Sequence, residues 1–234
     1  MRLALDVGGV IYYDEPFEVA WVQEVFDLAR ERDRSFTLED LRADLLSFHR
    51  NRDTGVFRRP LAHRAWLRVR DRWADLVQPI PGAVEAVREL AEHHAVCVVA
   101  NQPRECLRAL DRMDLTRLFS LVALDSLVGR AKPDPALLSF ACSRLGWEPA
   151  GVLVVGNRVD HDVIPARSLG CPVAFILPGD GWRVPAGVRP DVAEVHRALR
   201  PVPEALPEHL RREVRHVAAD LAGLAAALSG RGVG

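Results

Sequence analysis

This chain has almost no lysine. Among its 31 lysine and arginine residues only Lys132 is a lysine. An arginine guanidinium is a wide planar fork and a lysine ammonium is a compact charge, so a confined site that needs a small cation does not accept the exchange. Chance survival of one lysine is the competing interpretation. The turn-rich stretch Gly129–Pro135, which precedes a helical pattern, favours a functional role at a strand-to-helix junction.

Cysteines and long apolar runs are also scarce. The four cysteines form no Cys-x-x-Cys pair and lie in apolar patterns, so we expect free thiols rather than a metal or disulfide framework. No apolar run reaches membrane-spanning length, and Met1–Leu5 is too short for a signal peptide. We therefore expect a cytoplasmic protein without a membrane partner.

The formal net charge of −1 leaves no basic excess, which argues against nucleic-acid binding. A ligand must then be recognised by a local group of residues. With 234 residues, of which 49% are hydrophobic, the chain is long enough for one large domain and an insert.

Short apolar runs alternate with helical patterns, which predicts an α/β fold with a parallel sheet flanked by helices. The expected strands are Leu3–Asp6, Val96–Ala100, Leu118–Leu124, Val152–Val155 and Val173–Ile176. The expected helices between them are Ala83–His93, Glu105–Met113, Pro135–Leu145 and Val163–Leu169.

The segment between Tyr13 and Pro79 carries helical patterns instead of strands. Its expected helices are Phe17–Arg30, Leu38–Phe48 and Leu61–Val77, the last with an apolar stripe of tryptophan and aliphatic residues. We therefore predict a core domain of residues 1–13 and 80–200, an inserted helical cap of residues 14–79 and a helical extension of residues 201–234.

The extension shows apolar residues at alternating spacings of four and three. This pattern predicts the seam of a packed or coiled helix. Packing onto the chain's own core is the simpler expectation, and a homodimer through this helix is the alternative. The seam residues are Leu206, Leu210, Val214, Val217, Leu221, Leu224 and Leu228.

Polar residues follow several expected strands, where α/β proteins build their sites. Asp6 ends the first strand and precedes Gly8 and Gly9, so a carboxylate stands beside backbone that a ligand can approach. Such an aspartate serves as a nucleophile or a metal ligand, or it only caps a turn. Asn101 and Gln102 follow the second strand, where they either bond an anionic ligand or close the turn.

Asn157, Asp160 and Asp162 follow the fourth strand and supply oxygen atoms that suit a hard cation such as Mg²⁺. A helix N-terminus that merely carries acidic residues is the competing interpretation.

These four segments, in this order, resemble the haloacid dehalogenase-like (HAD) superfamily over most of Met1–Arg200. The resemblance implies a Rossmann-like core with a helical cap between the first and second motifs. It assigns the nucleophile to Asp6, the third-motif lysine to Lys132 and the acidic fourth motif to Asn157, Asp160 and Asp162.

For a phosphatase of this family the resemblance implies an aspartyl-phosphate on Asp6, stabilised by Lys132. It also implies Mg²⁺ held by Asp6, Gly8, Asn157, Asp160 and Asp162. The expected function is thus a hydrolase, most simply a phosphatase of small phosphorylated metabolites.

Three positions depart from the family pattern. Gly8 replaces the second aspartate that acts as general acid and base, Ala100 replaces a phosphate-binding hydroxyl, and Asn157 replaces a metal-binding aspartate. Loss of the acid alone predicts a rate loss on the order of 10²- to 10⁴-fold unless another group supplies the proton. Asp14 and His161 are the nearest candidates in the sequence.

The same residues fit two alternatives. Metal-independent haloacid dehalogenases of the superfamily also lack the second aspartate and carry an asparagine followed three residues later by an aspartate, as Asn157 and Asp160 are arranged. That subgroup has Thr where this chain has Val10 and Tyr where it has Leu138. The other alternative is a catalytically impaired binding protein that keeps the Asp6–Lys132 ion pair.

Two further substrate contacts are expected. The arginine-rich segment His49–Arg72 includes Arg50 beside the loop at Gly55, which would bind an anionic substrate if it lies over the site. The competing interpretation is a solvated helix face. Tyr12 and Tyr13, the chain's two tyrosines, follow the first motif, and we expect Tyr12 to line the binding site.

Overall fold

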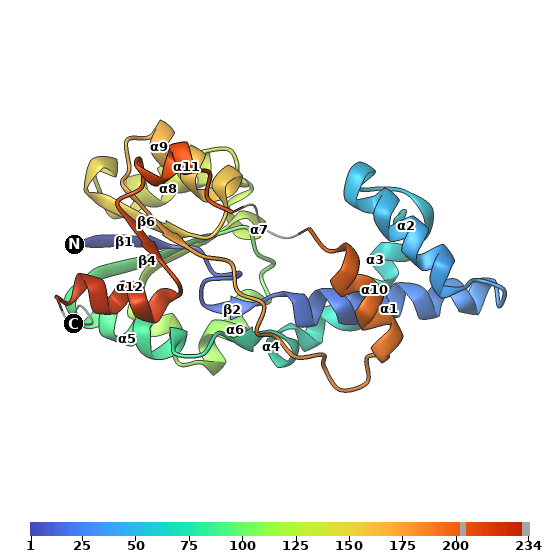
Figure 1. Ribbon diagram of the computed structural model, residues 1–234. Helices are drawn as coiled ribbons and strands as arrows, with labels where there is room; N and C mark the ends of the chain where they lie inside the picture. The colour runs from blue at the N-terminus through green and yellow to red at the C-terminus, as the bar shows by residue number, and fades with distance from the viewer. Residues whose placement is uncertain (202–204, 231–234) are drawn as a thin grey trace. The chain divides into compact units, whose positions relative to one another are not determined.

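A computed structural model describes residues 1–201 and 205–230 of the chain, which divide into two compact units (Figure 1). The first unit comprises Met1–Tyr13, Pro79–Gly181 and the described residues after 204. The second comprises Asp14–Gln78 and residues 182–201. None of the described helices is long and apolar enough to cross a membrane.

The first unit is built on a sheet of six parallel strands, ordered β5-β4-β1-β6-β7-β8, so the predicted fold class is confirmed. In the register, Leu5 of β1 lies opposite Val98 of β4 and Val155 of β6, so the carboxyl ends of these three strands meet at one edge. The strands are β1 (Arg2–Leu5), β4 (Ala95–Ala100), β5 (Phe119–Leu124), β6 (Val152–Gly156), β7 (Val173–Ile176) and β8 (His216–Ala218).

Helices cover both faces of this sheet (Figure 1). One face carries α8 (Ala136–Leu145), α9 (Ile164–Ser168) and α11 (Glu208–Arg211), whose apolar side chains form one core cluster with the strands. The other face carries α5 (Ala83–His93), α6 (Cys106–Arg112) and α12 (Leu221–Leu228). Burial of both faces explains why the strands read as continuous apolar runs.

The second unit is helical. Its helices are α1 (Glu15–Arg32), α2 (Leu38–Asn51), α3 (Leu61–Val69), α4 (Trp73–Leu76) and α10 (Pro190–Leu199). The two-residue strands β2 (Tyr12–Tyr13) and β3 (Gln78–Pro79) pair with each other and lie at the two ends of residues 14–78 in the sequence. The remaining α-helix of the described residues, α7 (Asp125–Val128), belongs to the first unit.

Helix α2 starts at a capping box, in which the side chains of Thr37 and Asp40 each accept a hydrogen bond from the other residue's backbone N–H group. Such a cap stabilises a helix by about 1 kcal/mol. The role of this unit as a cap over the sheet stays a prediction.

The aromatic stripe predicted over Leu61–Val77 forms part of the packing of this unit. The ring of Phe17 contacts those of Trp66 and Trp73 at centroid distances of 5.2 and 4.2 Å. The predicted single helix is divided into α3 and α4 by a short turn at Arg70–Arg72.

Residues 182–201 belong to the second unit, although the predicted boundaries place all of them up to residue 200 in the core. The physical reason is the apolar face of α10, whose Val192 is completely buried in the same cluster as Phe26 and Leu41. An ion pair of 2.7 Å between Arg200 and Glu15 adds a second attachment of this segment to α1.

The single helical seam predicted for the extension is wrong. The described residues of this segment form α11, strand β8 and α12, because Val217 lies in a strand that pairs with β7. Leu206, Leu210 and Val214 are buried in the core cluster beside α8 and α9. Most residues of the predicted seam are thus buried within the chain, which leaves few of them for a contact with a second copy. A homodimer through this segment stays a prediction. Residues 202–204 and 231–234 of the predicted extension lie outside the described residues.

Candidate active site

Asp6 lies at the carboxyl edge of the sheet, directly after the central strand β1. Its backbone N–H donates a hydrogen bond of 2.8 Å to the carbonyl of Val155, so pairing with β6 continues through this residue. Since β4 and β6 end beside it, residues from three strand ends converge on one carboxylate.

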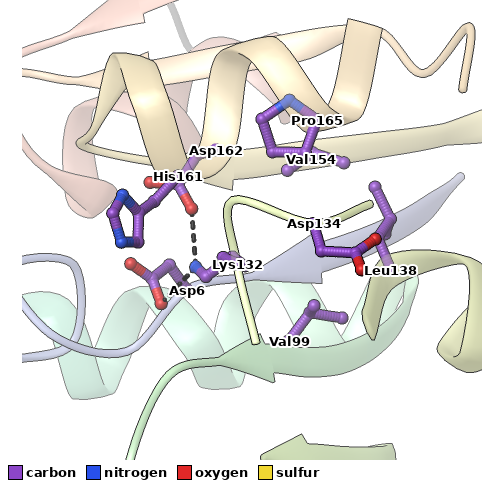
Figure 2. Close-up of a pocket in the computed structure, with 9 residues that line it drawn as sticks. All are labelled: Asp6, Val99, Lys132, Asp134, Leu138, Val154, His161, Asp162 and Pro165. Atoms are coloured by element: carbon purple, nitrogen blue, oxygen red, sulfur yellow. Dashed lines mark hydrogen bonds and ion pairs between the residues drawn. The ribbon is translucent and has the colours of Figure 1, made fainter. Parts of the chain in front are cut away.

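Lys132 lies against this carboxylate (Figure 2). Its Nζ atom is 2.9 Å from Oδ1 of Asp6 and 2.6 Å from Oδ1 of Asp162, and all three side chains are buried. Asn101 fixes the position of the lysine: its side-chain amide donates to the Lys132 carbonyl at 2.7 Å and accepts from the Lys132 N–H at 2.8 Å. The structure thus brings Asn101 to the site, but its amide binds backbone in this arrangement.

Asp162 orients Lys132. While its Oδ1 accepts from the lysine, its Oδ2 accepts backbone N–H bonds from Asn157 at 3.0 Å and Arg158 at 2.9 Å. Gly156 makes this arrangement possible, because a Cβ atom there would overlap the Asp162 carboxylate. Both oxygens of Asp162 are therefore occupied.

The charges of this group shift its proton equilibria. Burial raises the pKa of Asp6 to about 6, against the opposing attraction of Lys132, and the negative charge of Asp162 adds to the increase. Burial alone would lower the pKa of Lys132, but Asp162 and Asp6 outweigh it and raise that pKa above its usual value. The lysine is thus a permanent cation held between two carboxylates.

The loop after Asp6 is a tight turn. The N–H of Gly9 donates to the Tyr12 carbonyl at 2.8 Å, and Gly9 has a left-handed φ of 69°. A side chain at Gly9 would also overlap the amide of Asn157. This position therefore needs glycine for both its conformation and its close approach to the end of β6.

Tyr12 and Gln102 bond each other next to this loop. Tyr12 is completely buried, and its hydroxyl donates to Oε1 of Gln102 at 3.0 Å. The backbone N–H of Gln102 donates to Asp125 at 2.8 Å, a contact that the sequence analysis missed although Asp125 directly follows a predicted strand. These bonds support a positioning role, and direct contact of Tyr12, Gln102 or Gly8 with a substrate stays a prediction.

The structure separates Asp160 from the other predicted ligands. Its carboxylate pairs with Arg158 at 2.8 Å, and its side chain is 58% exposed. The reason is that Asp160 and Asp162 are two residues apart in one helical turn, Val159–Val163, so their side chains leave it on roughly opposite sides. Among the described residues no three His, Cys, Asp or Glu side chains are grouped so that they could hold a metal, and the metal-binding role of Asp160 and Asp162 stays a prediction.

The oxygen donors that remain fit a hard cation of the Mg²⁺ type. Oδ1 of Asn157 is buried and has no hydrogen-bond partner among the described residues. Because buried polar atoms are nearly always paired, an unpaired oxygen here is consistent with a ligand atom for an ion. Together with the carboxylate of Asp6 and the carbonyl of Gly8 it would supply oxygen ligands with a single formal charge. Such a set binds a cation more weakly than one with two or three carboxylates.

His161 lies at the site as well. It lines a cavity of about 10 Å³ together with Asp6, Lys132 and Asp162 (Figure 2). Its Nδ1 is 2.8 Å from Oδ2 of Asp160, and bonds from Arg158 and His161 lower the pKa of Asp160 to about 2 although burial opposes this. Arg50, by contrast, is exposed near the end of α2 in the second unit, so its contact with a substrate stays a prediction.

The comparisons with known proteins agree with this geometry. The family model of the haloacid dehalogenase-like hydrolases matches residues 2–170, and the chain belongs to this family. A phosphoglycolate phosphatase of Haemophilus influenzae (strain 86-028NP) is 32% identical over 107 residues, which cover 45% of this chain and 47% of that protein. An N-acetylmuramic acid 6-phosphate phosphatase of Pseudomonas aeruginosa is 29% identical over 122 residues, which cover 51% of this chain and 54% of that protein.

The chain thus spans about half the length of the curated relatives it matches. Among solved structures, a HAD phosphatase from Thermococcus onnurineus superimposes with a TM-score of 0.68 at 19% identity and covers 98% of both chains. At this identity the likeness supports the fold alone.

Proposed function

We propose that this protein is a phosphatase that hydrolyses small phosphorylated metabolites through an aspartyl-phosphate on Asp6. The observation that carries the proposal is the buried chain Asp6–Lys132–Asp162, which holds one carboxylate and one permanent cation at the carboxyl edge of the sheet. A fixed cation beside a nucleophilic carboxylate suits the transfer of an anionic phosphoryl group.

In the first step an oxygen of Asp6 forms a bond to phosphorus, and the bond from phosphorus to the ester oxygen breaks. Lys132 stabilises the charge of the transferring group, while Asp162 keeps the lysine from turning away. In the second step water attacks the phosphorus of the acyl phosphate, which releases inorganic phosphate and restores the Asp6 carboxylate. Bound Mg²⁺, held by Asp6, Asn157 and the Gly8 carbonyl, would supply further charge neutralisation on the phosphoryl oxygens.

His161 is the proposed proton donor to the leaving oxygen, the role for which Gly8 has no side chain. It lines the same cavity as Asp6, and the carboxylate of Asp160 lies 2.8 Å from its Nδ1, where it would stabilise the protonated imidazole that donates the proton. After the first transfer, the neutral imidazole accepts a proton from the attacking water.

The relatives support a small substrate. The names of two of them specify phosphoglycolate and N-acetylmuramic acid 6-phosphate, both small phosphate monoesters. Four buried cysteines, none of them in a disulfide, support a reducing cytoplasm as the location.

A screen of phosphate monoesters and 2-haloacids, each with MgCl₂ or EDTA, tests this function. The panel contains 2-phosphoglycolate, N-acetylmuramic acid 6-phosphate, glycerol 3-phosphate and 4-nitrophenyl phosphate, and D6N is the control. We expect release of inorganic phosphate that depends on Mg²⁺ and is abolished in D6N, because an amide is not a nucleophile here. Halide release in EDTA would indicate the dehalogenase alternative, and no release from any compound would indicate a binding protein; either result overturns the proposal.

A further inference from the structure

The second unit contains a cavity of about 480 Å³ that the proposed reaction does not use. Its volume falls in the range of sites for small organic ligands, roughly 300–1,000 Å³. Its lining includes three aromatic and three charged side chains from α1, α2 and the segment up to α3: Trp21, Phe48, Phe57, Arg52, Asp53 and Arg59.

The aromatic side of this cavity is a connected wall. The rings of Phe48 and Phe57 are 4.9 Å apart with an interplanar angle of 30°, and that of Trp21 lies 5.4 Å from Phe57. The indole N–H of Trp21 donates to the carbonyl of Ala62 at 3.1 Å, which fixes its orientation. The rings are tilted against one another, by 51° between Trp21 and Phe57, and aromatic rings also pack favourably in such inclined, edge-to-face arrangements.

The charged side of the cavity is cationic. Neither Arg52 nor Arg59 forms an ion pair with any described residue, whereas Arg68 of the same unit pairs with Glu24 at 2.6 Å. Asp53 accepts the backbone N–H of Arg59 at 3.2 Å, and the guanidinium of Arg52 lies 5.9 Å from the centre of the Phe48 ring. Two guanidinium groups without a carboxylate partner therefore border the aromatic wall.

We propose that this cavity binds a small anion that carries a planar ring, such as an aryl carboxylate, sulfonate or phosphate. The ring packs against the aromatic wall of Trp21, Phe48 and Phe57, and the anionic group is bonded by Arg52 and Arg59. The inference is independent of the proposed phosphatase activity, because every lining residue belongs to the second unit and the test measures binding.

Titration calorimetry of the full chain with 2-naphthalenesulfonate, which is not a phosphate ester, tests the proposal. Cyclohexanesulfonate keeps the anion without the planar ring, and 2-naphthol keeps the ring without the anion. We expect one site per chain that binds 2-naphthalenesulfonate at least about tenfold more tightly than either comparison compound.

Variants locate the site. We expect R52Q/R59Q to weaken binding about tenfold or more and F48L, which keeps apolar volume, to reduce the advantage over cyclohexanesulfonate. R42Q, an exposed arginine of α2 that does not line the cavity, is the matched control, and unchanged binding in K132A, which lacks the cation at the carboxyl edge of the sheet, excludes that edge as the binding site. Circular dichroism establishes that each variant is folded. Equal affinity for the three compounds, binding unchanged in R52Q/R59Q, or no binding at all would overturn the proposal.

Discussion

At the scale of single residues, Lys132 is a cation with two partners, Asp6 and Asp162. We expect K132R and K132A each to lower kcat/KM at least about 100-fold, because the arginine fork overfills the confined space and alanine removes the charge. K132A should also lose about 3 kcal/mol of unfolding free energy, since it leaves two buried carboxylates without their cation.

Steady-state kinetics and urea unfolding measure the two effects. R130Q, which changes a neighbouring exposed residue, is the control. Unchanged kinetics in K132R would mean that the lone lysine is an accident of composition.

The proposed role of His161 leads to a prediction about leaving groups. The oxygen that leaves an alkyl phosphate needs a proton, whereas nitrophenolate leaves almost without one. H161Q should therefore lower kcat/KM about 10²-fold or more for alkyl phosphates and less than about tenfold for 4-nitrophenyl phosphate. H93Q, on the exposed side of α5, is the matched control. Equal losses for the two substrate classes would assign His161 a purely structural role.

The sequence identified the central residues of the site because they follow strands that must meet at one sheet edge. Asp6, Lys132 and Asp162 were expected there and do meet. The sequence could not separate Asp160 from Asp162, because side-chain directions within one helical turn depend on where that turn begins. It also could not show that Asn101 binds the backbone of Lys132.

At the scale of elements, the C-terminal segment contributes to both faces of the sheet. We expect L224A in α12 to lose about 2–5 kcal/mol of unfolding free energy, because this side chain is completely buried. V217A in β8, where the side chain is 38% exposed, should lose less than about 1 kcal/mol.

Urea unfolding at two protein concentrations measures both. A midpoint that rises with concentration would support the homodimer alternative instead of burial within the chain.

The predicted strands agree with the observed ones to within a residue or two, since each is a short, mainly apolar run between helical patterns. Strand β8 was missed because three residues, His216–Ala218, are too few to show an alternating pattern. The spacing of four and three that predicted one long helix is equally satisfied by two short helices that flank a strand.

At the scale of the whole molecule, the second unit depends on residues 182–201, which lie far from its other residues in the sequence. V192A, within α10, should lose about 2 kcal/mol of stability in this unit because it opens space beside α1 and α2. Hydrogen exchange should show faster exchange in α1 and α2 and unchanged protection in β4 and β6. V184A, at an exposed position of the same segment, is the control. If V192A instead reduced protection only in the sheet, residues 182–201 would not belong to the second unit.

The strand order has a consequence for synthesis on the ribosome. The neighbours of β1 are β4, which begins at Ala95, and β6, which begins at Val152, so the strand that ends beside Asp6 is translated long before either partner emerges. The helices of residues 14–78 are likewise translated before Val192, which is part of their apolar core. Apolar segments of both units therefore remain exposed until late in translation, which makes this chain a candidate client of chaperones that bind nascent polypeptides.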